Sequence, residues 1–161
     1  MGAKQTWDSL PGWAKGTLAI AGAAATVLTV YAVYRGTKNF IASKNARQEI
    51  TDVTNEIKTL PKKATLTPSQ LSGLANQLHT AFDGYGTSYS GVIKAMVYMN
   101  NDADVLSLIK EYGVREISSG KWNPTPNFKG TLGQTIADEL ADDERSAVNT
   151  TLANKGIKYR F

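Results

Sequence analysis

Cysteine is absent from the 161 residues, and histidine occurs only once, as His79. The lack of thiols excludes disulfide frameworks, thiolate nucleophiles, zinc fingers and iron–sulfur clusters. A single histidine leaves little scope for histidine metal sites or catalytic triads. The sequence also lacks a glycine-rich phosphate-binding loop with lysine and a nucleophile elbow. We therefore expect that the protein is not an enzyme and that it needs no cofactor.

The excess of positive charge is small and confined to one region. Eighteen Lys and Arg stand against 14 Asp and Glu, a net charge of +4. Residues 35–63 hold seven basic and three acidic residues, a net +4, whereas residues 1–34 carry +1 and residues 64–161 carry −1. Because the C-terminal portion is nearly neutral, its charge argues against a nucleic-acid-binding domain, and we expect no specific nucleic-acid partner.

Charge is missing altogether from one segment near the N-terminus. Residues 16–34 are nineteen uncharged residues, which as a helix would span roughly 28 Å, about one hydrocarbon core. A buried helix of this length needs a larger protein around it, and a signal peptide has a more basic start and a shorter apolar core. We therefore expect a transmembrane helix over residues 13–35 after a short N-terminal segment, residues 1–12.

Both ends of this segment carry residues of the kinds that hold a helix at the membrane interface. They are Trp13, Lys15, Tyr31, Tyr34, Arg35 and Lys38. More basic residues follow the segment than precede it, so the positive-inside rule places the N-terminus outside and the main domain inside. The lipid bilayer is thus the first expected partner. Small residues at four-residue spacing would also permit self-association of two such helices.

A basic amphipathic stalk helix is predicted over residues 36–60, where apolar residues recur at steps of three, four and three. These residues are Ile50, Val53, Ile57 and Leu60. Pro61 ends the helix, and residues 61–67 are predicted to be a linker. The narrow apolar stripe must pack on a surface, and the sequence leaves three open: its own domain, a second copy of the chain, or a partner.

The remaining residues, 68–161, predict a compact domain of five helices. Apolar residues at helical spacing mark each helix, and Thr67 and Thr131 each stand three residues before a glutamine, the pattern of a capping box. No alternating strand pattern appears, so residues 114–130 are predicted to be a loop. The expected fold class is all-α: a transmembrane helix that continues into a helical stalk, followed by the five-helix domain.

The helix order and three short motifs resemble an annexin repeat, the five-helix unit of calcium-dependent membrane-binding proteins. The motifs are the segments AFDGYGT over residues 81–87, YGVR over residues 112–115 and ADEL over residues 137–140. The resemblance implies a Ca²⁺ site formed by the carbonyls of Phe82, Gly84 and Gly86 and the carboxylate of Glu139, because Ca²⁺ binds six to eight oxygens. The family has several tandem repeats, whereas one copy is present here. A tight turn between helices without any ligand is the alternative.

Two aromatic residues of the predicted loop, Trp122 and Phe128, would either anchor a partner or fold over the domain core. The turn over residues 83–87, Asp-Gly-Tyr-Gly-Thr, is also similar to the Asp-Gly-x-x-Gly-Thr turn of small helical peptidoglycan-binding domains and is one residue shorter. The carboxylates over residues 138–144 are explained by helix capping rather than by catalysis.

The sequence as a whole predicts a non-enzymatic single-pass membrane protein with a structural or scaffolding role. It would link a membrane to a neighbouring protein layer, or assemble with further copies of itself. The lack of cysteine and of any catalytic constellation fits a bacterial envelope or the inner membrane of a membrane-containing bacteriophage virion. The alternative is a membrane-tethered module that binds lipid or peptidoglycan in a Ca²⁺-dependent manner.

Overall fold

The computed structural model describes residues 45–84, 86–118 and 127–161, and these are mostly helical. A helix over residues 45–59 comes first. It is followed by α3 (Pro68–Phe82), α4 (Tyr89–Val97), α5 (Asp102–Tyr112), the strands β1 (Arg115–Ile117) and β2 (Phe128–Gly130), α6 (Leu132–Glu139) and α7 (Asp142–Ala153). The described part of residues 68–161 thus contains the five predicted helices, and the all-α class is confirmed at this level.

The predicted transmembrane helix, residues 13–35, lies outside the described residues, as does the first part of the predicted stalk. Among the described helices, none combines the length and the apolar character that crossing a bilayer requires.

Both predicted capping boxes are present, and they set where α3 and α6 begin. At the start of α3, the Thr67 hydroxyl accepts from Gln70 N at 3.3 Å while Gln70 Oε1 accepts from Thr67 N at 2.8 Å. Thr131 and Gln134 repeat the pair at the start of α6, at 3.3 and 3.0 Å. Each pair provides partners for two N–H groups that the start of a helix leaves without intrahelical acceptors.

The loop predicted over residues 114–130 is corrected by the structure to a short antiparallel hairpin. Ile117 of β1 pairs with Phe128 of β2, and both side chains are buried. Each strand is only three residues long, which is too short for the alternation of apolar and polar residues that identifies a strand in a sequence.

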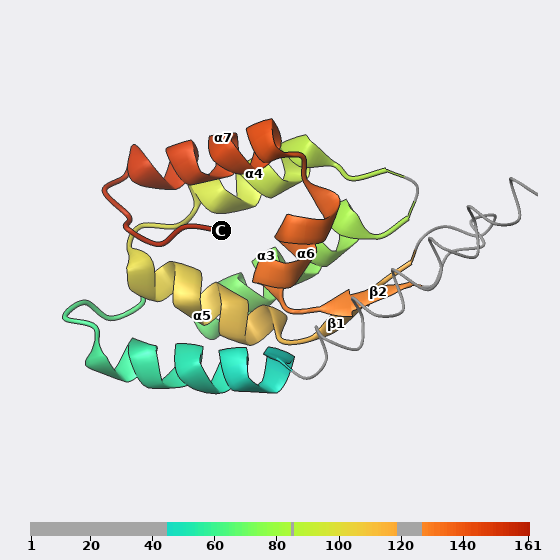
Figure 1. Ribbon diagram of the computed structural model, residues 1–161. Coiled ribbons are helices and arrows are strands. Elements are labelled where there is room, and N and C mark those ends of the chain that lie inside the picture. The colour runs from blue at the N-terminus through green and yellow to red at the C-terminus, as the bar shows by residue number, and fades with distance from the viewer. Residues whose placement is uncertain (1–44, 85, 119–126) are drawn as a thin grey trace, which may run out of the picture.

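The helices enclose one hydrophobic core, and α3 lies at its centre. It packs against α4 and α5, while α4 also packs against α7, and α6 packs against α5 and β2. Figure 1 shows α4 and α7 side by side on one edge of the domain, with α5 between them and helix 45–59. The largest fully buried side chains include Phe82, Leu78, Met96, Leu108 and Tyr112.

Helix 45–59 packs on this domain through the apolar stripe seen in the sequence. Val53 is buried in the core, and Ile50, Ile57 and Leu60 pack against it. Glu49 adds a polar contact, since its Oε2 accepts a hydrogen bond of 2.8 Å from the hydroxyl of Thr131, the N-cap of α6. The sequence left three possible surfaces on which the stripe could pack. The structure shows that it packs on the chain's own domain.

The linker after helix 45–59 is held by a buried carboxylate, Asp104 of α5. Asp104 accepts hydrogen bonds from Thr65 N (2.6 Å), the Thr65 hydroxyl (2.8 Å), Leu66 N (3.1 Å) and Asn100 N (3.0 Å). Burial alone raises the pKa of this carboxyl, but the hydrogen bonds outweigh burial and lower the pKa below its usual value. Asp104 is thus an ionised hub that joins the linker to α5.

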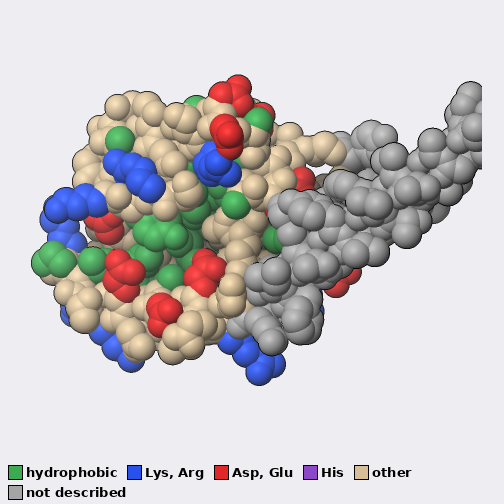
Figure 2. Space-filling view, in the orientation of Figure 1, with side chains coloured by type: hydrophobic (Ala, Val, Ile, Leu, Met, Phe, Trp, Pro, Cys, Tyr) green, Lys and Arg blue, Asp and Glu red, His purple; other side chains and the backbone are tan. Residues whose placement is uncertain are grey.

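The C-terminal tail is fixed to α5 and α7 by hydrogen bonds. Asp102 Oδ1 accepts from the backbone N–H groups of Lys158 (2.8 Å) and Tyr159 (2.7 Å). Asn149 of α7 exchanges two hydrogen bonds with the backbone of Phe161. Burial, together with the charges of Glu49 and Glu56, raises the pKa of Tyr159 to about 12. Figure 2 shows the face of the molecule that is turned to the viewer in Figure 1, and hydrophobic side chains are visible in its middle.

Candidate functional site

The glycine-rich turn between α3 and α4 is the part of the domain that the sequence marked as a metal site. Gly84 and Gly86 have φ angles of +108° and +84°, a conformation that other residues rarely adopt. The turn is closed by Ser88 N, which donates to the Ala81 carbonyl at 2.7 Å. Residue 85 lies outside the described part.

The end of β1 holds one side of this turn. Asp83 Oδ1 accepts a hydrogen bond of 2.8 Å from Ser118 N, and Gly84 N donates to the Ser118 carbonyl at 3.4 Å. The hairpin that the sequence did not reveal therefore positions the first residues of the turn.

Glu139 reaches the same turn from the end of α6. Its Oε2 accepts a hydrogen bond of 3.1 Å from the Thr87 hydroxyl, across 52 residues of sequence. The fold thus brings Glu139 beside the turn that contains Gly84 and Gly86. The fourth residue of the predicted set, Phe82, has its side chain in the core at 1% exposure. The described residues contain no group of three or more His, Cys, Asp or Glu side chains that would hold a metal ion.

A buried tyrosine, Tyr112, is influenced by the charges of this turn region. Tyr112 is 2% exposed. Burial raises the pKa of its hydroxyl, the nearby Thr135 and Arg115 oppose this, and the charges of Glu139 and Asp83 add to it. The carboxylates of Glu139 and Asp83 are therefore close enough to Tyr112 to act on the pKa of its hydroxyl.

Arg115 holds this arrangement to α3. Its guanidinium lies 5.0 Å from the centre of the Tyr112 ring, Nε donates to the Tyr112 carbonyl, and Nη1 donates to Asn76 Oδ1 at 2.9 Å. Tyr112 and Arg115 belong to the YGVR motif, so the sequence contained a signal for them. The contribution of Ser118 had no such signal, because it depends on the hairpin.

The other residues singled out from the sequence have different locations. Phe128 is 3% exposed on β2, so it folds over the core and is not an exposed anchor for a partner. Trp122 lies outside the described residues, as do the six expected membrane-interface residues, which all precede residue 45. His79 is half-buried on α3, and its Nδ1 has no hydrogen-bond partner in the described part of the chain.

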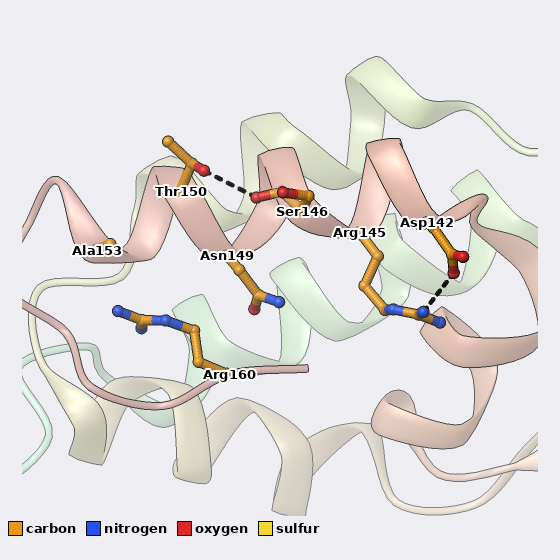
Figure 3. Close-up of a pocket in the computed structure, with 7 residues that line it drawn as sticks. All are labelled: Asp142, Arg145, Ser146, Asn149, Thr150, Ala153 and Arg160. Carbon is orange, nitrogen blue, oxygen red and sulfur yellow. Dashed lines mark hydrogen bonds and ion pairs between the residues drawn. The ribbon is translucent and has the colours of Figure 1, made fainter.

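A shallow pocket of about 330 Å³ lies along α7, and Arg145 and Arg160 are among the residues that line it (Figure 3). Both cations already have partners in the protein. Arg145 forms an ion pair with Asp142, and Arg160 donates to the carbonyls of Ile157 and Tyr159. The pocket is therefore explained by contacts that fix α7 and the tail.

Comparison of the chain with models of protein families, with curated proteins and with solved structures finds no match.

Proposed function

We propose that the chain is a non-enzymatic, single-pass membrane protein with a structural or scaffolding role, in which residues 13–35 anchor an all-α domain to a bilayer. One observation carries the proposal. A nineteen-residue segment without charge ends at residue 34, and only residues 35–44 separate it from a helix that packs on the domain.

The docked helix limits how far the domain lies from the expected membrane segment. Val53 fixes the middle of helix 45–59 in the core, and Glu49 ties its first half to α6. Ten residues remain between the uncharged segment and this helix, and they span at most about 35 Å when fully extended. A domain held so close suits a protein that keeps a partner layer at a short distance from a membrane, as in an envelope or a membrane-containing virion.

Membrane extraction tests this proposal. The full chain, expressed in a bacterial host, is expected to stay with the membranes in alkaline carbonate and to be released by a nonionic detergent. Aspartates at Val27 and Val30 should release it into carbonate, because each acidic residue at the centre of a membrane helix costs about 3 kcal/mol. Aspartates at Thr6 and Ser9 are the matched control and should change nothing. Release of the unaltered chain by carbonate would contradict the proposal.

Ca²⁺-dependent binding of lipid or peptidoglycan through the turn over residues 83–88 is the second candidate function. The observation that favours it is the hydrogen bond between Thr87 and Glu139, which places an acidic side chain beside two glycines of positive φ. Carbonyl and carboxylate oxygens are the ligands that Ca²⁺ prefers.

Calorimetry of the full chain in detergent tests the second candidate. Ca²⁺ in the millimolar range is expected to release heat and to raise the melting temperature. Both effects should disappear in Glu139→Ala and persist in Glu111→Ala, which removes an exposed carboxylate of α5. No heat from the unaltered chain would remove this candidate function.

A further inference from the structure

A cleft of about 540 Å³ opens where the end of helix 45–59, the start of α5 and the tail meet. It belongs neither to the glycine-rich turn nor to the pocket along α7. Its lining residues come from three parts of the chain that are distant in sequence, and they include Leu60, Lys62, Asn100, Lys155, Lys158 and Tyr159.

Positive charge predominates along this cleft. Three lysines line it, Lys62, Lys155 and Lys158, against two carboxylates, Glu56 and Asp102. One group of each sign is already engaged, since Asp102 Oδ1 accepts from two backbone N–H groups of the tail and Lys155 Nζ donates to the Val97 carbonyl. Figure 2 shows Lys and Arg side chains at the left edge of the face, with Asp and Glu side chains beside them.

The apolar floor of the cleft and its polar lining limit which ligands it would bind. Leu60 and Tyr159 supply apolar surface, and both are only partly buried. The side-chain amides of Asn100 and Asn101 add hydrogen-bonding groups, although each already donates to the linker. Glu56 also stands in the lining, and its charge opposes any anionic group placed next to it, so the acidic side chains of an occupant would lie toward the lysines.

The geometry points to a docking site for an acidic peptide segment of a partner protein, with its carboxylates at the lysines and an apolar side chain on Leu60 and Tyr159. Charge complementarity selects this occupant, because Lys62 and Lys158 beside an apolar floor favour a peptide that carries both acidic and apolar side chains. This partner class rests on the proposed scaffolding function, for which it names the chemistry of the neighbouring layer.

The cleft and the expected membrane segment lie at opposite ends of helix 45–59 in the chain. The cleft lies at the residue-59 end of helix 45–59, while the expected membrane segment leads into the residue-45 end. A helix of this length separates its two ends by about 21 Å.

A peptide selection tests the proposal. The full chain in nonionic detergent is used to select from a random twelve-residue peptide library on phage. The selected peptides are expected to be enriched in Asp and Glu together with Leu or aromatic residues. A labelled selected peptide should then bind about tenfold more weakly to the double variant Lys62→Glu/Lys158→Glu, because attraction becomes repulsion at the rim. Added salt should also weaken its binding.

The matched control is Lys94→Glu/Lys110→Glu, which reverses two exposed lysines on α4 and α5. It should bind the peptide like the unaltered chain, and equal melting temperatures show that both variants are folded. A selection without enrichment, peptides that are not acidic, or unchanged binding to the cleft variant would overturn the proposal. So would tighter binding of a single-stranded oligonucleotide. These outcomes do not depend on whether residues 13–35 cross a membrane, so the two proposals fail separately.

Discussion

Replacement of Asp104 by alanine is expected to lower the free energy of unfolding by about 3 kcal/mol, since three buried or partly buried backbone N–H groups lose their acceptor at about 1 kcal/mol each. These groups belong to Thr65, Leu66 and Asn100. The Asp104 side chain is completely buried, so water replaces it only if the linker moves. The linker between helix 45–59 and α3 should therefore loosen together with the start of α5.

Urea unfolding of the full chain in detergent measures this effect. The control is Asp143→Ala, which removes an exposed carboxylate in the first turn of α7, and it should change the free energy of unfolding by less than about 0.5 kcal/mol. Equal losses in the two variants would contradict the role assigned to Asp104.

The stability of the protein at low pH should depend on the same carboxylate, Asp104. Its pKa is lower in the folded state than the ordinary value of 3.8. A group with a depressed folded pKa adds stability above its unfolded pKa, and this stability is lost as the pH falls through the folded pKa. The unaltered chain should therefore lose stability below about pH 4 more steeply than Asp104→Asn, which cannot titrate. Parallel curves would show that folding does not lower the pKa of Asp104.

Replacement of Val53 by aspartate is expected to destabilise the domain by about 3 kcal/mol or more, because an unpartnered charge would enter the core. Val53 is 6% exposed and belongs to the same buried cluster as α3, α4 and α5. The domain avoids this cost only by releasing helix 45–59, which would expose the apolar surface that Ile50 and Ile57 now cover.

Asn55→Asp is the matched control, since it adds the same side chain to an exposed position of the same helix. Urea unfolding should separate the two variants clearly if the helix is docked. A free stalk would predict that Val53→Asp and Asn55→Asp behave alike.

Local signals in the sequence were sufficient for the helices of the domain. Thr67 with Gln70 and Thr131 with Gln134 predicted where two helices begin, because a capping box involves residues only three positions apart. The turn at Gly84 and Gly86 was predicted for the same reason, since both glycines have positive φ.

Contacts between residues that are distant along the chain could not be predicted from the sequence. The stripe that contains Val53 predicted a buried face but not its partner, because helical periodicity identifies a face and carries no information about what covers it. Asp104 was not singled out, since its acceptor role depends on Thr65, 39 residues away. The contact of Glu139 with Thr87 was expected only from the annexin resemblance. The hairpin that positions Ser118 was missed because its strands are three residues long.

A single membrane crossing that places the domain on one side is the central feature of the proposed function. The sequence contains no cysteine, so the side on which a residue lies can be measured directly. A single introduced cysteine is then the only thiol of the chain that a maleimide labels. Two conservative variants serve, Ser9→Cys before the uncharged segment and Ser146→Cys at an exposed position of α7.

A membrane-impermeant maleimide is applied to intact cells that express each variant, with and without permeabilisation. If the chain crosses once with its N-terminus outside, Ser9→Cys is labelled in intact cells, whereas Ser146→Cys is labelled only after permeabilisation. Labelling of both variants in intact cells, or of neither, would show that the two residues lie on the same side and would contradict a single crossing.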